Sequence, residues 1–134
     1  MKEQDLISFF QNDKFAKHTG VKILEAGKGF CKAELKIEPH HLNAANVIQG
    51  GAIFTLADTA FAVASNSHET LALAVNANIS FLKGVSTGIL TATATEVDYP
   101  KRIGAYDVLI TDQTSNVIAR FSGLVYRKNE TIGA

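Results

Sequence analysis

Residues 50–66 read GGAIFTLADTAFAVASN, and this stretch decides how the rest of the chain folds. Five of its residues are alanines, a density that favours a helix over a strand. The helix expected over residues 50–67 is apolar almost all round, so it has to be buried. We therefore expect it to be enclosed by a sheet or by a second subunit.

The segments on either side of this helix are typical of strands. Residues 21–26 and 30–37 flank the turn Gly27-Lys28-Gly29, and the second of them alternates apolar with charged residues. This pattern predicts a hairpin with one buried face. After the helix, a four-stranded meander is expected, separated by short breakers, over residues 71–83, 88–99, 104–112 and 117–128.

The order of these elements predicts the fold class. A short amphipathic helical segment over residues 1–20 precedes two strands, the long helix and four more strands. Consecutive strands with one helix between them indicate an α+β fold with an antiparallel sheet wrapped around one long central helix. With 134 residues, the chain has the usual size of a single domain, residues 1–134.

The balance of charges excludes several classes of function. Thirteen basic residues match thirteen acidic ones, whereas a nucleic-acid groove or a surface for anionic membranes needs a basic excess. Charged residues make up only 19% of the chain, which favours a homo-oligomer because part of the surface then becomes an interface. A single cysteine, Cys31, excludes an internal disulfide and a thiolate zinc site. With no targeting segment visible, we expect a cytoplasmic protein without a bound metal.

Asp58 is the residue that departs from the apolar pattern of the long helix. An ionised carboxylate is costly to desolvate there. Helical spacing places it on a narrow stripe of small or polar residues, which could line a cleft: Gly51, Thr55, Asp58, Ala62 and Ser65. The structural alternative is that Asp58 only accepts a hydrogen bond from Thr55 or from an arginine of a partner subunit.

The start of the same helix offers a second chemical element. The sequence Gln49-Gly50-Gly51 leaves backbone N–H groups that no side chain obstructs, at the positive end of the helix dipole. Such donors can stabilise a carbonyl oxygen that gains negative charge. An acyl group polarised at Gly50 could then be attacked by water activated at Asp58, or by the carboxylate itself.

A wider set of residues carries a family resemblance. Asn43, the run GGAIFTLADTAFA over residues 50–62, and the later segments at 78–83, 101–108 and 121–123 resemble the hotdog-fold acyl-CoA thioesterases of the phenylacetate-degradation type. The resemblance covers roughly residues 15–128. It implies the hotdog fold, a dimer or dimer of dimers, and an active site between subunits.

The resemblance also implies residue roles. Asp58 would be the nucleophile or general base, the Gly50 N–H would polarise the thioester carbonyl, and Asn43 would hold the carbonyl or the attacking water across the subunit interface. Gln49 stands where the family usually has histidine. Glutamine donates and accepts hydrogen bonds but does not titrate near neutrality, so a hydrogen-bonding role is what remains for it.

Further residues are expected to contact the substrate, and coenzyme A enters as part of that substrate, with no separate cofactor. Basic side chains could hold its phosphates at the mouth of the cleft. Some relatives orient water with a serine on the strand after the helix, where this chain has Ala74, and Asn76 or Asn78 could substitute. The expected substrate contacts are Gly51, Thr59, Asn78, Phe81, Lys83, Lys101 and Arg102.

Hydrolysis of a small or medium acyl-CoA thioester, aromatic or aliphatic, is the leading hypothesis. Gln49 and Ala74 motivate an alternative, a non-catalytic module that binds acyl-CoA. Hydratase or dehydratase chemistry ranks last, because hotdog relatives with that activity generally use a histidine, and none precedes Gly50 here.

Overall fold

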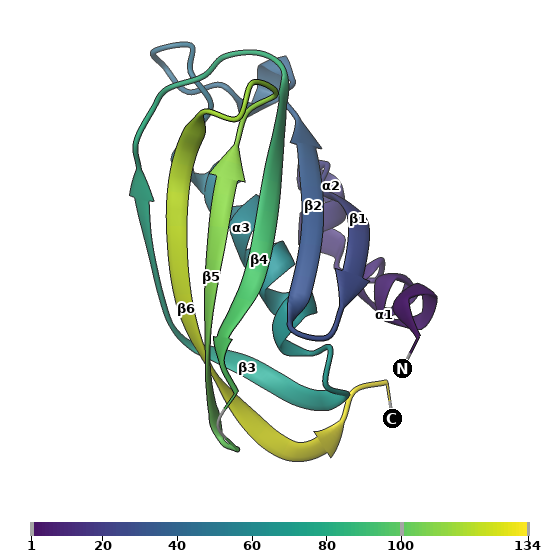
Figure 1. The fold of residues 1–134 in the computed structure, drawn as a ribbon. Helices are drawn as coiled ribbons and strands as arrows, with labels where there is room; N and C mark the ends of the chain where they lie inside the picture. The colour runs from purple at the N-terminus through teal and green to yellow at the C-terminus, as the bar shows by residue number, and fades with distance from the viewer. Residues whose placement is uncertain (1, 100, 134) are drawn as a thin grey trace.

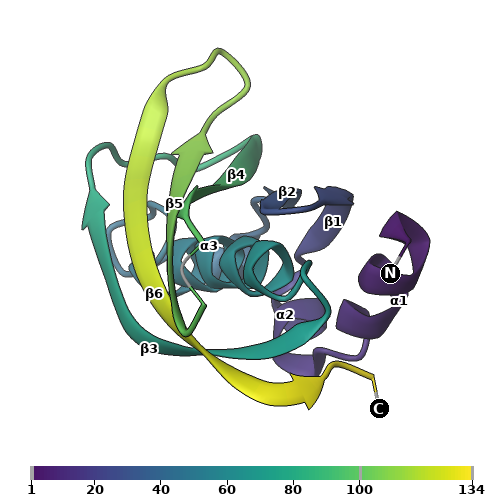
Figure 2. The same cartoon turned by 60° about the horizontal axis from the view of Figure 1, so that its bottom comes forward.

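A computed structural model describes residues 2–99 and 101–133 and shows a six-stranded antiparallel sheet curled around one long helix (Figures 1 and 2). The helices are α1 (Glu3–Phe10), α2 (Lys14–Thr19), the 3-10 turn η1 (Pro39–His41) and the central α3 (Gly50–Ser65). The strands are β1 (Lys22–Gly27), β2 (Phe30–Lys36), β3 (Thr70–Phe81), β4 (Ile89–Asp98), β5 (Ile103–Thr111) and β6 (Val117–Thr131). The predicted fold class is confirmed.

One part of the predicted topology is wrong. The strand order is β1-β2-β4-β5-β6-β3, so β4, β5 and β6 form a meander, but β3 pairs with β6 at the far edge. The connection over residues 82–88 carries the chain across the end of the sheet to β4 (Figure 1). β4 turns Leu90, Ala92 and Ala94 into the core, whereas most of β3 is exposed. The strand with the buried face therefore takes the central place beneath α3.

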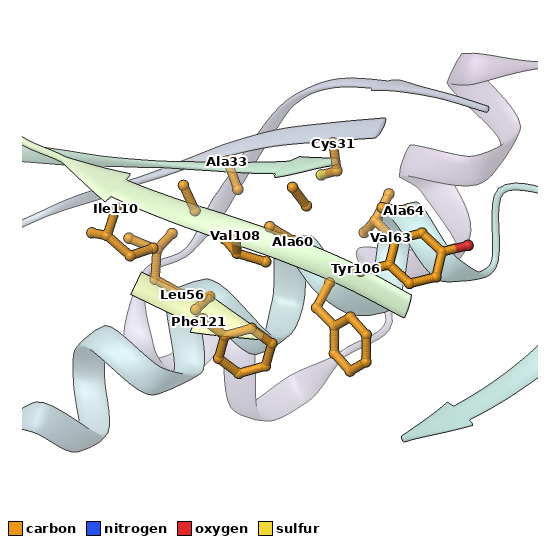
Figure 3. Packing of buried hydrophobic residues seen from close by; sticks show 14 of the residues in the cluster. Cys31, Ala33, Leu56, Ala60, Val63, Ala64, Tyr106, Val108, Ile110 and Phe121 are labelled. Atoms are coloured by element: carbon orange, nitrogen blue, oxygen red, sulfur yellow. The ribbon is translucent and has the colours of Figure 1, made fainter. Parts of the chain in front are cut away.

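Small side chains let α3 pack closely on the middle of the sheet. α3 lies mainly against β2 and β4. Both strands turn alanines toward it, and Ala33, Ala92 and Ala94 are completely buried (Figure 3). Cys31 shares this face, where burial raises the pKa of its thiol to about 12, so the thiol is a core residue without reactivity at neutral pH.

The two N-terminal helices cover the side of α3 that the sheet leaves open (Figure 2). Asp13 caps α2 by accepting a hydrogen bond from the Ala16 N–H at 3.0 Å, and Gly20 ends it with φ +104°. The side chain of Glu3 accepts a hydrogen bond from the Ala26 N–H at 2.9 Å and so attaches α1 to β1. In the part of the chain that the structure describes, no helix is long and apolar enough to cross a membrane.

A large residue faces a glycine where α3 meets the outer strands. Phe61 is almost fully buried, with its ring centroid 5.3 Å from that of Phe121 and 5.9 Å from that of Tyr106. A Cβ atom at Gly123 of β6 would lie only 2.6 Å from the Phe61 ring. Gly123 therefore makes the room that the phenylalanine occupies.

We predict that Gly123→Ala lowers the free energy of unfolding by about 1–3 kcal/mol, because the Phe61 ring has no room to move. Gly27→Ala is the matched control, since a Cβ atom there meets nothing within 4 Å, and it should change stability by less than about 0.5 kcal/mol. Urea denaturation of both variants measures the difference. Equal midpoints for the two would contradict this account of the packing.

Candidate active site

Asp58 lies half-buried in a groove between α1, α3 and β3. Phe9 and Phe10 form one wall, and Leu71 and Ala74 belong to the other; the volume is about 260 Å³. We call this space the Asp58 groove. Among the described residues that line it, Asp58 is the one ionisable group. Of the predicted stripe of α3, Asp58, Ala62 and the buried Ser65 border the groove, whereas Gly51 and Thr55 lie outside its lining.

The electrostatic surroundings disfavour the charged form of Asp58. Burial raises the pKa of its carboxyl group above the ordinary value, and the negative charge of Asp13 on the neighbouring α2 raises it further. Within residues 2–99 and 101–133 the carboxylate has no hydrogen-bond partner. The Thr55 hydroxyl, one turn away, donates to the Gly51 carbonyl at 2.8 Å instead. The Thr55 contact considered from sequence is therefore absent, and the carboxylate is left available.

The loop before α3 is held in place by a histidine. The buried His41 ring accepts a hydrogen bond from the Glu38 N–H at 2.9 Å through Nδ1 and contacts the Thr19 carbonyl at 2.6 Å through Nε2. Its own carbonyl accepts from the Gln49 N–H at 2.8 Å. These bonds fix the position at which α3 begins.

A second groove lies at the start of α3. Asn43, Gly50, Phe81 and Lys83 line it, and its volume is about 310 Å³; we call it the Gly50 groove. Four predicted site residues meet here. The Asn43 side-chain oxygen accepts from the backbone N–H groups of Ala45 and Val47, at 2.9 and 3.3 Å, which leaves its amide NH₂ as the donor for a ligand.

Gln49 has a structural role that its sequence position does not reveal. Its side-chain oxygen accepts a hydrogen bond from the Gly51 N–H at 2.6 Å and so caps α3. The Gly50 N–H, by contrast, has no acceptor among the described residues. The Phe81 ring covers Gly50 closely, because a Cβ atom there would lie 3.0 Å from it. Gly50 and the Phe81 ring that covers it both line the groove.

The two grooves are separate in one chain. Gly50 and Asp58 are eight positions apart on α3, which is about 12 Å along the axis at 1.5 Å per residue. One carbonyl carbon therefore cannot contact both groups of the same chain. The sequence predicts that Gly50 and Asp58 act on the same acyl group, and within a single chain they are too far apart to do so.

The remaining predicted contacts are scattered. Lys101 and Arg102 lie beside Arg127 and Thr70, whereas Lys83 follows the other end of β3, so all of β3 separates them from Lys83. Asn78 pairs with Ser122 on the exposed outer face of the sheet, and Asn76 shares that face. Thr59 is buried and donates its hydroxyl to the Thr55 carbonyl at 2.7 Å.

Sequence reasoning missed the contribution of the N-terminal segment. Phe9, Phe10 and Asp13 border or influence Asp58, yet only the docking of α1 and α2 on α3 brings them there. Two adjacent phenylalanines on a short amphipathic helix were the available signal, because one such helix cannot bury both rings in the same core.

Comparison with known proteins identifies the family of this chain. Residues 45–119, more than half of the chain, match the sequence profile of the thioesterase superfamily. The chain belongs to the thioesterase superfamily. It is 36% identical over 130 residues to the acyl-coenzyme A thioesterase PaaI of Escherichia coli, covering 96% of this chain and 93% of PaaI. A protein of Archaeoglobus fulgidus, provisionally named as an esterase, is 43% identical over 122 residues, covering 90% and 79% of the two chains.

The solved structures give the same result. The structure of E. coli PaaI, from the phenylacetic acid degradation operon, superposes with a TM-score of 0.91 at 35% identity, covering 96% of this chain and 94% of that one. This chain is therefore a PaaI-like thioesterase with the hotdog fold, and it is a thioester hydrolase. The family and fold expected from the sequence are confirmed.

We predict that replacing Asp58 of this thioesterase with asparagine raises its stability at neutral pH. Between the ordinary pKa of 3.8 and the raised value, the folded chain binds more protons than the unfolded chain. The free energy of unfolding therefore falls as the pH rises through that window, and Asp58→Asn abolishes this loss. Melting temperatures should favour the variant at pH 7 and converge near pH 3.5.

Asp107→Asn is the control for the change of charge, because Asp107 lies on the exposed outer face of β5. A gain at pH 7 of the same size in both variants would show that burial of Asp58 is not the cause.

Proposed function

We propose that this thioesterase hydrolyses the thioester of a small or medium acyl-CoA, with Asp58 as the group that drives the attack. The observation that carries the proposal is the Asp58 carboxylate, half-buried in an apolar groove and without a hydrogen-bond partner among the described residues. A desolvated carboxylate of raised pKa is a stronger base than one in water. The similarity to E. coli PaaI supports coenzyme A as the thiol half of the substrate.

Two routes fit this site. Asp58 takes a proton from water as the oxygen attacks the thioester carbon, or its own oxygen attacks and water then hydrolyses the resulting anhydride. In both routes the carbon–sulfur bond breaks, the CoA sulfur leaves and is protonated, and the acyl group ends as a carboxylic acid. Neither route needs a cofactor.

We propose that the complete site forms between two copies of the chain. The 12 Å between Gly50 and Asp58 along α3, about eight residues at 1.5 Å each, prevents both from serving one carbonyl in one copy. A second copy would bring its Gly50 N–H and the Asn43 amide to the Asp58 groove of the first. The Gly50 N–H then binds the carbonyl oxygen as negative charge develops on it, and Lys83 beside it is positioned to bind a CoA phosphate.

Thiol release from a panel of esters tests the proposal: acetyl-, hexanoyl-, phenylacetyl-, hydroxybenzoyl- and palmitoyl-CoA. We expect release from at least one of the shorter esters, and a loss of about 10³-fold or more in kcat for Asp58→Asn. Unchanged oligomeric state in the variant is the control. Intact acyl-CoA binding with no release from any ester would instead support a binding module, and Gln49→His would then be the variant to examine.

We predict a separate loss when the Gly50 N–H is removed. Proline is accepted at the first position of a helix, and Gln49 before it has the extended backbone (φ −68°, ψ 135°) that a following proline requires. Gly50→Pro should therefore lower kcat by about 10²–10³-fold with the fold intact.

Gly50→Ala is the matched control, because it brings the same Cβ contact with Phe81 but keeps the N–H. Equal activity of the proline and alanine variants would remove this donor from the mechanism. Steady-state kinetics on the best ester of the panel measures both variants.

A further inference from the structure

The Asp58 groove has a neighbouring hollow that the reaction does not use. This hollow, which we call the N-terminal cavity, has a volume of about 330 Å³ and lies under α1, α2 and the start of β1. Ile7, Val21 and Ile23 give it apolar walls, and Thr59 of α3 forms part of its floor. Asp58 borders one hollow and Thr59 the other, so the two hollows lie on neighbouring faces of α3.

Phe10 is the residue that both hollows share. It lines the Asp58 groove together with Phe9, and it lines the N-terminal cavity together with Ile7. It is partly buried and packs against the hydrophobic core, with its ring centroid 5.1 Å from that of Phe9 in an edge-to-face arrangement. Phe10 is thus the one side chain that the linings of the two hollows have in common.

The size of the Asp58 groove limits what it can hold. An apolar cavity of about 150 Å³ binds benzene, which has six carbons, so a groove of 260 Å³ accommodates roughly ten carbons. The walls offered by Phe9, Phe10, Leu71 and Leu73 are apolar and match an uncharged acyl group next to the reactive carboxylate. A phenyl ring or a chain of about six carbons fits, whereas a chain of sixteen does not.

We propose that Phe10 sets the upper limit on acyl length by closing the Asp58 groove against the N-terminal cavity. This inference rests on the proposed function and names the acyl half of the substrate, a group of about ten carbons or fewer. Without the ring, the two hollows join into one channel of more than twice the volume, which runs from Asp58 under α2. Its walls in the N-terminal cavity are apolar at Ile7, Val21 and Ile23, and the rest of that lining includes Gln11, Asp13, Lys17 and Lys22. Phe10 is a specificity residue and takes no part in the chemistry.

The experiment compares kcat/KM for palmitoyl-CoA and hexanoyl-CoA in Phe10→Ala and in the unchanged enzyme. We expect the palmitoyl/hexanoyl ratio to rise by about tenfold or more in the variant, because the extra methylenes gain apolar contacts. Ile7→Ala is the matched control: it enlarges the N-terminal cavity but leaves the partition in place, so the ratio should stay unchanged. An equal rise in both variants, or none in Phe10→Ala, would overturn the inference.

Two further variants separate the role of Phe10 from a failure to fold and from a failure of the proposed function. If Phe10→Ala fails to fold, as judged by circular dichroism, Phe10→Leu opens the partition in part and should raise the same ratio, and an unchanged ratio there would count against the inference. Hexanoyl-CoA hydrolysis that Asp58→Asn abolishes, together with an unmoved ratio, would leave the proposed function standing and reject only the role of Phe10. No hydrolysis of any ester of the panel by the unchanged enzyme would reject both.

Discussion

The close approach of α3 to the sheet is the constraint on which the rest of this structure depends. The inner faces of β2 and β4 carry alanines, and Gly123 lies beneath Phe61. These small residues let α3 and its side chains pack against a strongly curved sheet. Interiors are packed like crystals, so this fit of small against large residues also fixes the rotation of α3 about its own axis. That rotation decides which residues of α3 face the core and which face a groove.

The same rotation explains why a carboxylate can occupy the middle of a buried helix. The sheet covers α3 from one side, β3 is an edge strand that stands partly away from it, and α1 closes the remaining gap only in part. Asp58 is therefore shielded enough to lose much of its hydration, but it still borders open space. This chain thus carries Asp58 on a rigid element, which holds the carboxylate in one position at a cost in stability.

Much of this could be read from the sequence, because helix and strand periodicity and their breakers are local signals. The long helix, the strands and the part of the cleft-facing stripe from Asp58 to Ser65 follow from spacing alone. The pairing of β3 with β6 does not, because it depends on which strand α3 must cover. Nor do the cap formed by Gln49 and the presence of Phe10 at the groove, since both arise from how separate segments dock.

The attachment of α1 has a consequence for how such enzymes diversify. This eight-residue helix lies outside the sheet and is joined to it by few bonds, among them that between Glu3 and the Ala26 N–H. Mutations in a peripheral element of this kind disturb little of the packing that α3 requires. The walls of the Asp58 groove that α1 supplies can therefore be changed by a few substitutions near the amino terminus, with little effect on the stability that the core around α3 provides.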